Sequence, residues 1–154
     1  DLEDTIRCKG FTGGVAHAAH EPVKLVRIGD DAEVSLDELK GAVVAPFCGI
    51  GNPRGFERTL ESLGAKLSNM GTYRMDDHAA ITERVLTNQI VPFIRTSHEV
   101  GATCAVCTQK DAVKFRDSGV KLEVTLPIYE LRVEFRIIKN VEGLKEALKA
   151  AVGE

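Results

Sequence analysis

The stretch Ala42–Pro53 reads Ala-Val-Val-Ala-Pro-Phe-Cys-Gly-Ile-Gly-Asn-Pro, and it carries the strongest indication of the fold class. Its first part, Ala42–Phe47, is a continuous apolar run, which is typical of a strand covered on both faces of a sheet. A glycine-containing turn follows. Asn52 then provides a helix cap, and Pro53 suits the first helical position. A buried strand that passes through a tight turn into a helix is a building unit of α/β folds.

Further strands and helices alternate on both sides of this stretch. Apolar or alternating runs predict strands at residues 23–28, 42–47, 66–70, 102–107 and 129–138. Caps or amphipathic repeats predict helices that begin near residues 35, 52, 82, 108 and 141, and Pro92 should kink the third of these. We therefore predict an α/β three-layer sandwich with a mainly parallel sheet and an antiparallel edge strand near the C-terminus, at 129–138. Residues 1–20 are expected to be irregular, and residues 21–154 to form a single α/β domain.

Composition and charge fit one soluble globular domain. The chain has 154 residues, of which 44% are hydrophobic and 28% charged. A net charge of -3 provides no general attraction to nucleic acid or anionic lipid. No apolar run is long enough to cross a bilayer, and the start has no signal-peptide pattern. Because the chain begins at Asp1 rather than Met, we expect it to be a piece of a longer protein.

The sequence Asp76-Asp77-His78 is the first candidate for chemistry. A carboxylate beside an imidazole can hold it in one tautomer and raise its basicity, which suits proton transfer at neutral pH. The cluster lies between a predicted strand end and the helix expected to begin at Thr82. Loops in that position commonly carry the sites of α/β proteins. The alternative is a polar loop with one carboxylate near a helix N-terminus, and the pattern alone leaves both open.

Two other strand ends carry candidate residues. The turn at Gly49 and Gly51 could aim backbone N–H groups at an anion. However, Arg54 stands where a dinucleotide fingerprint needs Gly or Ala, and no phosphate-loop motif occurs, which favours a tight turn before a capped helix. Lys110 and Asp111 directly follow the strand at 102–107 and could face a cleft. The pattern alone favours the alternative, in which they form the solvated first turn of a helix that Thr108 caps.

The four cysteines do not indicate a disulfide framework in a domain with this much apolar sequence. Cys104 and Cys107 invite a zinc or redox interpretation, with His17 and His20 far upstream. Their spacing places the two sulfurs on opposite faces of a strand, so reduced thiols in a cytosolic setting are the simpler interpretation. The two histidines are expected to be surface groups.

Taken in order, these loops resemble the tetraacyldisaccharide 4'-kinases, also called lipid A 4'-kinases. The segment from Gly49 to Phe56 resembles that family's Gly-Ile-x-x-Pro-x-x-Phe segment. Asp77-His78 with Thr82 resembles its Asp-His-His-x-Tyr-Thr motif, and the segment from Thr108 to Lys114 resembles its Thr-Glu-Lys-Asp-Ala-Val-Lys segment. The resemblance covers residues 20–150. This chain departs from the family at three positions, which are Ala79, Ile81 and Gln109.

The resemblance implies a two-domain kinase at a membrane surface, of which this chain is only the C-terminal domain. It implies that an N-terminal domain carries the phosphate loop and binds ATP and Mg²⁺, and that the substrate is a lipid disaccharide. It also implies a peripheral location on the cytoplasmic face of the inner membrane, and no nucleic-acid partner.

The resemblance assigns the roles of individual residues as well. His78 becomes the candidate catalytic residue with Asp77 beside it, while Asp76 is expected to be a surface charge. The residues expected to be structural or to line the cleft are Gly49, Gly51, Asn52, Lys110 and Asp111. No cofactor or metal is expected to bind this chain itself.

Two other classes of function remain open at this point. The first is a non-enzymatic α/β module that binds a partner or a sugar phosphate. The second is a small stand-alone enzyme that uses Asp77-His78 and Lys110, although the sequence offers it no nucleophile or cofactor loop of known mechanism.

Overall fold

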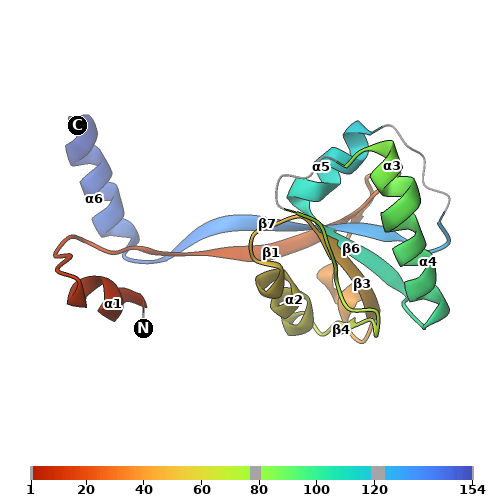
Figure 1. The fold of residues 1–154 in the computed structure, drawn as a ribbon. Coiled ribbons are helices and arrows are strands. Elements are labelled where there is room, and N and C mark those ends of the chain that lie inside the picture. Colours follow the sequence, from red (N-terminus) through yellow and green to blue (C-terminus); the bar gives the residue numbers. More distant parts are fainter. Residues whose placement is uncertain (1, 77–80, 119–123, 154) are drawn as a thin grey trace. The chain divides into compact units, whose positions relative to one another are not determined.

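The computed structural model describes residues 2–76, 81–118 and 124–153 (Figure 1). The chain divides into two compact units, one of residues 22–133 and one that combines residues 1–21 with residues 134–154. The larger unit carries the α/β core. Strands β1 (His17–Arg27) and β7 (Ile128–Lys139) contribute residues to both units.

The described residues form one mixed, mainly parallel sheet in the order β2-β1-β7-β6-β3-β4, with β5 paired to β3. The bounds of the other strands are β2 Glu33–Val34, β3 Val43–Cys48, β4 Lys66–Leu67, β5 Tyr73–Arg74 and β6 Cys104–Thr108. Strand β3 pairs in parallel with β4, β5 and β6, and β6 pairs in parallel with β7. The pair β1–β2 is antiparallel.

Helices cover both faces of this sheet (Figure 1), which confirms the predicted three-layer sandwich. Side chains on β3 alternate between the two faces because successive residues of a strand point in opposite directions. Val44 and Cys48 pack with Leu60 of α2 (Pro53–Ser62). Ala45 and Phe47 pack on the other face, against α4 (Val91–Glu99) and α5 (Gln109–Asp117). The continuous apolar run of β3 is therefore explained by burial on both sides.

The predicted caps position the helices that follow the strands. The Asn52 side chain accepts a hydrogen bond from Gly55 N at 3.0 Å, and Pro53 occupies the first turn of α2. Ser35 caps the 3₁₀ helix η1 (Leu36–Leu39). Thr82 caps α3 (Glu83–Val85), from which the π-helix η2 (Leu86–Ile90) leads into α4. Pro92 lies in the first turn of α4, so the predicted kink takes the form of a π-helical turn before a proline that lacks an N–H group.

A proline inside a central strand would normally cost a hydrogen bond of the sheet. Val44 O accepts from Ser68 N, and Cys48 O accepts from Met75 N, so these even-numbered residues bond toward β4 and β5. Pro46 lies between them, opposite the gap that separates β4 from β5. Its missing N–H group therefore falls where β3 has no strand partner, and the pairing with β6 stays intact.

The predicted edge position of the strand at residues 129–138 was wrong. Strand β7 lies between β1 and β6, and it runs parallel to β6. Its first four residues, Ile128–Leu131, are buried, whereas most residues from Arg132 to Lys139 are partly or fully exposed. The alternation with charged residues arises in this second, exposed half. The antiparallel strand at the end of the sheet is β2 instead.

Residues 1–20 also differ from the expected irregular structure. Helix α1 spans Leu2–Cys8, and β1 already begins at His17. At the other end of the chain, α6 spans Val141–Val152, as predicted. None of the described helices combines the length and the apolar character that crossing a membrane requires.

We predict that Leu60→Ala lowers the free energy of unfolding by about 2–5 kcal/mol, because it leaves a cavity under α2, where the Leu60 side chain is fully buried. Urea denaturation of the two proteins measures this difference. The matched control is Leu148→Ala in α6, where the leucine is 58% exposed and the expected change is within about 0.5 kcal/mol. Similar losses for both variants would contradict the assignment of the core.

Candidate functional site

The three loops selected from the sequence begin side by side at one edge of the sheet. Phe47 of β3 pairs in register with Cys107 of β6 on one side and with Tyr73 of β5 on the other. Because these strands are parallel, their carboxyl ends share an edge. The chain leaves that edge at Gly49, at Met75 and at Gln109.

Asp111, in the first turn of α5, joins two of these loops. It is fully buried, and its Oδ2 accepts one hydrogen bond from Gly49 N at 3.0 Å and one from Thr108 Oγ1 at 2.6 Å. The Nζ of Lys114, one turn along α5, lies 3.8 Å from Oδ1. Hydrogen bonds to an ionised group are stronger than neutral ones, about 1.5–3 kcal/mol each. The predicted structural role of Asp111 therefore corresponds to a specific contact across 62 positions of sequence.

Gly49 is buried and packs closely against the third loop. A Cβ atom at this position would lie 3.3 Å from Asp111 Oδ1, 3.3 Å from Asp76 O and 3.4 Å from Met75 Cβ. Met75 N also donates a hydrogen bond to Cys48 O at 2.9 Å. A Cβ atom here would be crowded on three sides and its neighbours would have to move by a few tenths of an ångström, so glycine suits this turn.

The turn at Gly49–Asn52 is poorly suited to hold a phosphate group. The N–H of Gly49 already donates to a carboxylate, and that of Gly55 donates to the Asn52 cap. The Gly49 N–H is therefore not available to an anion in this arrangement. Burial raises the pKa of the neighbouring Cys48 thiol to about 11, and the negative charge of Asp111 acts in the same direction.

Metal ligands are likewise not gathered at this edge. Within the described ranges, no three His, Cys, Asp or Glu side chains lie together in a way that could hold an ion.

The candidate pair Asp77-His78, together with Ala79, lies outside the described residues. Asp76, the last described residue before it, is exposed, as expected for a surface charge. Gly51, Asn52 and Lys110 are exposed at the same edge, and Asn52 serves as the cap of α2. The structure thus brings Gly49 and Asp111 together and leaves the other three at the surface.

A second buried carboxylate, Glu130 in β7, was missed by the sequence analysis. Its Oε2 lies 2.6 Å from Arg116 Nη1, and its Oε1 accepts from Arg132 Nε at 2.9 Å. Arg116 Nε also donates to Asp31 at 2.9 Å. One pattern in the sequence could have indicated this burial. Glu130 stands between the apolar residues Tyr129 and Leu131, and an arginine that can pair with it follows two positions later. These contacts fix the last turn of α5 to the sheet.

Cys104 and Cys107 behave as buried thiols rather than as a metal pair. All four cysteines are free, and Cys104 and Cys107 pack in different core clusters on opposite faces of β6, as their spacing predicted. Burial raises the pKa of Cys104 to about 11 and the pKa of Cys107 well above its usual range. Thiolates are the reactive and metal-binding form, so both residues are unsuited to redox or zinc chemistry.

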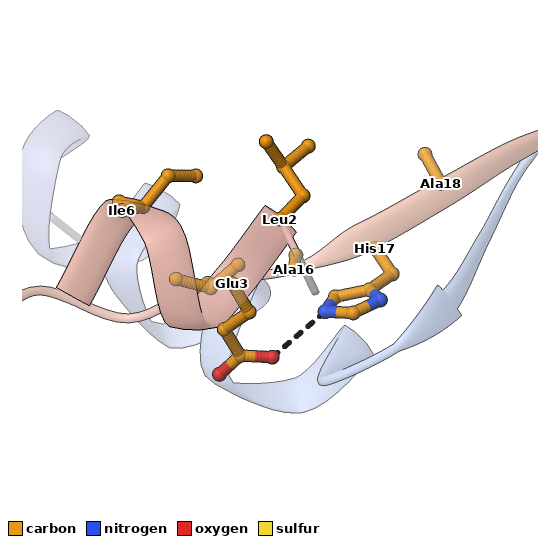
Figure 2. A pocket seen from close by; sticks show the side chains of 7 residues that line it. Leu2, Glu3, Ile6, Ala16, His17 and Ala18 are labelled. Atoms are coloured by element: carbon orange, nitrogen blue, oxygen red, sulfur yellow. Dashed lines mark hydrogen bonds and ion pairs between the residues drawn. The ribbon is translucent and has the colours of Figure 1, made fainter. Parts of the chain in front are cut away.

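The smaller unit contains a pocket of about 550 Å³ that the sequence did not indicate. Its lining residues are Leu2, Glu3, Ile6, Val15, Ala16, His17 and Ala18. Figure 2 shows the His17 ring directed at the Glu3 carboxylate, with 2.8 Å between Nε2 and Oε2. Hydrogen bonds from Lys139, His17 and Arg7 lower the pKa of Glu3 to about 2. His17 is thus half-buried and paired, whereas His20 is exposed, as expected, and makes an edge contact with Phe135.

We predict that Gly49→Ala lowers the free energy of unfolding by about 1–3 kcal/mol, because the new methyl group meets a buried carboxylate and a backbone carbonyl that have little space to move. Chemical denaturation measures the change. Gly14→Ala is the control, since the nearest atom to its new Cβ would lie 3.9 Å away. A Gly49 variant as stable as the control variant would refute the close packing at this turn.

We also predict that one thiol per folded chain, Cys8, reacts quickly with a disulfide reagent at pH 8, because it is the exposed cysteine. Thiols with a pKa of about 11 are ionised to roughly one part in a thousand at that pH, and Cys48, Cys104 and Cys107 are buried as well. Cys8→Ser should abolish the fast phase. Rapid modification of two or more thiols in the native chain would contradict the burial described above.

Comparison with known proteins places this arrangement in a family. The family model described as "Tetraacyldisaccharide-1-P 4'-kinase" matches residues 4–153. The tetraacyldisaccharide 4'-kinase of Elusimicrobium minutum is 33% identical over 146 residues, which is 95% of this chain and 35% of that protein. The enzyme of the same name from Chlamydia muridarum is 32% identical over 127 residues, or 82% of this chain and 32% of that protein. The chain therefore spans about a third of the length of these curated relatives.

A solved structure has the same fold. It is the crystal structure of LpxK from Aquifex aeolicus in complex with ATP, with a TM-score of 0.50 and 18% sequence identity. The match covers 99% of this chain and 44% of that one. With the family model matching nearly the whole sequence, the chain belongs to the tetraacyldisaccharide 4'-kinase family.

Proposed function

We propose that this chain is the C-terminal domain of a lipid A biosynthesis kinase. The full-length enzyme transfers the γ-phosphoryl group of ATP to the 4'-hydroxyl of a tetraacyldisaccharide 1-phosphate. The observation that carries the proposal is the meeting of three family-like loops at one sheet edge, marked by the hydrogen bond from Gly49 to Asp111. Membership of the kinase family supports the reaction class.

In this proposal, the domain supplies an assisting histidine at the cleft it forms with the rest of the enzyme. Phosphoryl transfer depends mostly on positioning, on charge stabilisation and on a base that takes the hydroxyl proton. His78 supports the carboxylate that acts as this base, and Asp77 orients His78 or its loop. Asp76, which is exposed, has no role in the reaction.

The phosphate donor binds elsewhere in the full-length protein. The N–H group of Gly49 is engaged by a buried carboxylate and is therefore not free to bind a phosphate group. We assign ATP and Mg²⁺ to a phosphate-loop domain that precedes this one in the polypeptide, as the short span of this chain relative to its relatives allows. The assembled enzyme acts on its lipid substrate from the cytoplasmic face of the inner membrane, as a peripheral protein.

We predict that His78→Ala in the full-length kinase lowers kcat/KM by about 10²-fold or more, because the carboxylate that takes the hydroxyl proton loses the histidine that supports it. A steady-state assay of phosphate transfer to the lipid disaccharide measures the loss. Unchanged kcat/KM would exclude the assisting role and favour a non-enzymatic module.

The matched control is His98→Ala in the last turn of α4. The His98 ring contacts Ala102 O at 3.2 Å, just before β6 begins, and therefore lies at the amino end of the strands rather than at their carboxyl end. This variant should retain kcat/KM to within about threefold. Equal losses in both variants would point to general loss of folding instead of a role at the site.

A further inference from the structure

We propose that Asp111 is a positioning residue for the kinase reaction, because its buried carboxylate fixes Gly49 and, through Gly49, the backbone at Asp76 where the Asp77-His78 loop begins. The inference rests on the proposed function, since it takes that loop to serve phosphoryl transfer. It assigns Asp111 no contact with substrate.

The Asp111 carboxylate is held through one of its two oxygens. Both hydrogen bonds of Asp111 end on Oδ2, one from the turn after β3 and one from the last residue of β6. A group that is fully buried and held by two donors has little freedom to rotate. The position of Gly49 N is thereby fixed relative to Thr108 and the start of α5.

Gly49 in turn packs against Met75 and Asp76, the first residues after β5. A Cβ atom added at Gly49 would lie 3.3 Å from Asp76 O and 3.4 Å from Met75 Cβ, so the Gly49 backbone packs closely against both residues. The hydrogen bond from Met75 N to Cys48 O holds the same segment on its other side. A displacement of the turn would therefore move Met75 and Asp76, which directly precede Asp77.

A carboxylate is a costly side chain at this fully buried position. Burial of a carboxylate is unfavourable unless its oxygens are paired, and an apolar residue would fill the same space at lower cost. Asp111 Oδ1 has no hydrogen-bond partner among the described residues, and its nearest described cation is Lys114 Nζ at 3.8 Å. A costly buried carboxylate that is kept for two hydrogen bonds, one from the Gly49 backbone and one from the Thr108 hydroxyl, is expected where the placement of a loop matters more than stability.

The test uses kcat and KM of the full-length kinase. Asp111→Ala should lower kcat by about tenfold or more while KM for both substrates changes by less than about threefold, because misplacement of a reacting group affects the chemical step. Asp111→Asn should restore kcat to within about threefold, since its amide oxygen can accept both hydrogen bonds. Asp117→Asn, an exposed aspartate on the same helix, should equal the wild type.

The double variant Asp111→Ala/His78→Ala shows whether Asp111 acts by positioning the His78 loop or only by stabilising the fold. If Asp111 acts through the loop, Asp111→Ala/His78→Ala should be no slower than His78→Ala alone, whereas independent effects would multiply. Multiplied losses, equal losses in the Ala and Asn variants, or a wild-type kcat in folded Asp111→Ala would each overturn the inference. If Asp111→Ala does not fold, Asp111→Ser takes its place, with the same expectation, because its shorter side chain ends too far from Gly49.

Hydrogen exchange at the Gly49 amide distinguishes failure of this inference from failure of the proposed function. Loss of its protection in Asp111→Ala, with protection kept in Asp111→Asn, is the expected result. If His78→Ala has normal activity, the proposed role of the histidine fails, and the exchange data still decide whether Asp111 holds the turn. Wild-type protection of Gly49 in Asp111→Ala would overturn the inference whatever the kinetics show.

Discussion

The parallel pairing of β3 with β6 is the constraint on which the rest of the structure depends. The four residues from Val44 to Phe47 lie in register with the four from Cys104 to Cys107, and all eight are buried. A shift by one residue would turn every side chain to the wrong face, so burial on both sides fixes the register. That register brings the residues after the two strands to a common edge. Gly49 and Asp111 meet for this reason alone, although no local sequence signal connects them.

Helix α5 is held at both ends by buried carboxylates, and the two are used differently. At its first turn, Asp111 bonds to uncharged donors, Gly49 N and Thr108 Oγ1. At its last turn, Arg116 pairs with Glu130 of β7, which Arg132 also neutralises. Buried ion pairs contribute little net stability, but they are costly to disrupt and therefore favour one arrangement. The helix thus has a defined position along the sheet. Its first turn, which lies at the edge with the candidate site, is therefore fixed as well.

Much of this architecture could be predicted from local patterns, and the failures have physical reasons. The apolar run of β3 and the caps at Asn52 and Thr108 are decided by neighbours within four residues, and these predictions are confirmed. Strands β2 and β5 have two residues each, too few for any periodicity to appear. The edge position expected for β7 was wrong because its exposed half dominates the pattern. The bond between Gly49 and Asp111 and the burial of Glu130 depend on tertiary contacts. The role of Asp77-His78 stays a prediction.

The proline in β3 has a further consequence, for the solubility of the sheet. Because Pro46 offers no N–H group, the strand beside β3 is divided into β4 and β5, with two residues each. A long, flat edge strand presents a row of unpaired backbone groups to which another chain can add, and very short edge strands remove that opportunity. On this side of the sheet, a single residue in the interior therefore acts against edge-to-edge aggregation, a hazard that the apolar, parallel strands would otherwise carry during folding.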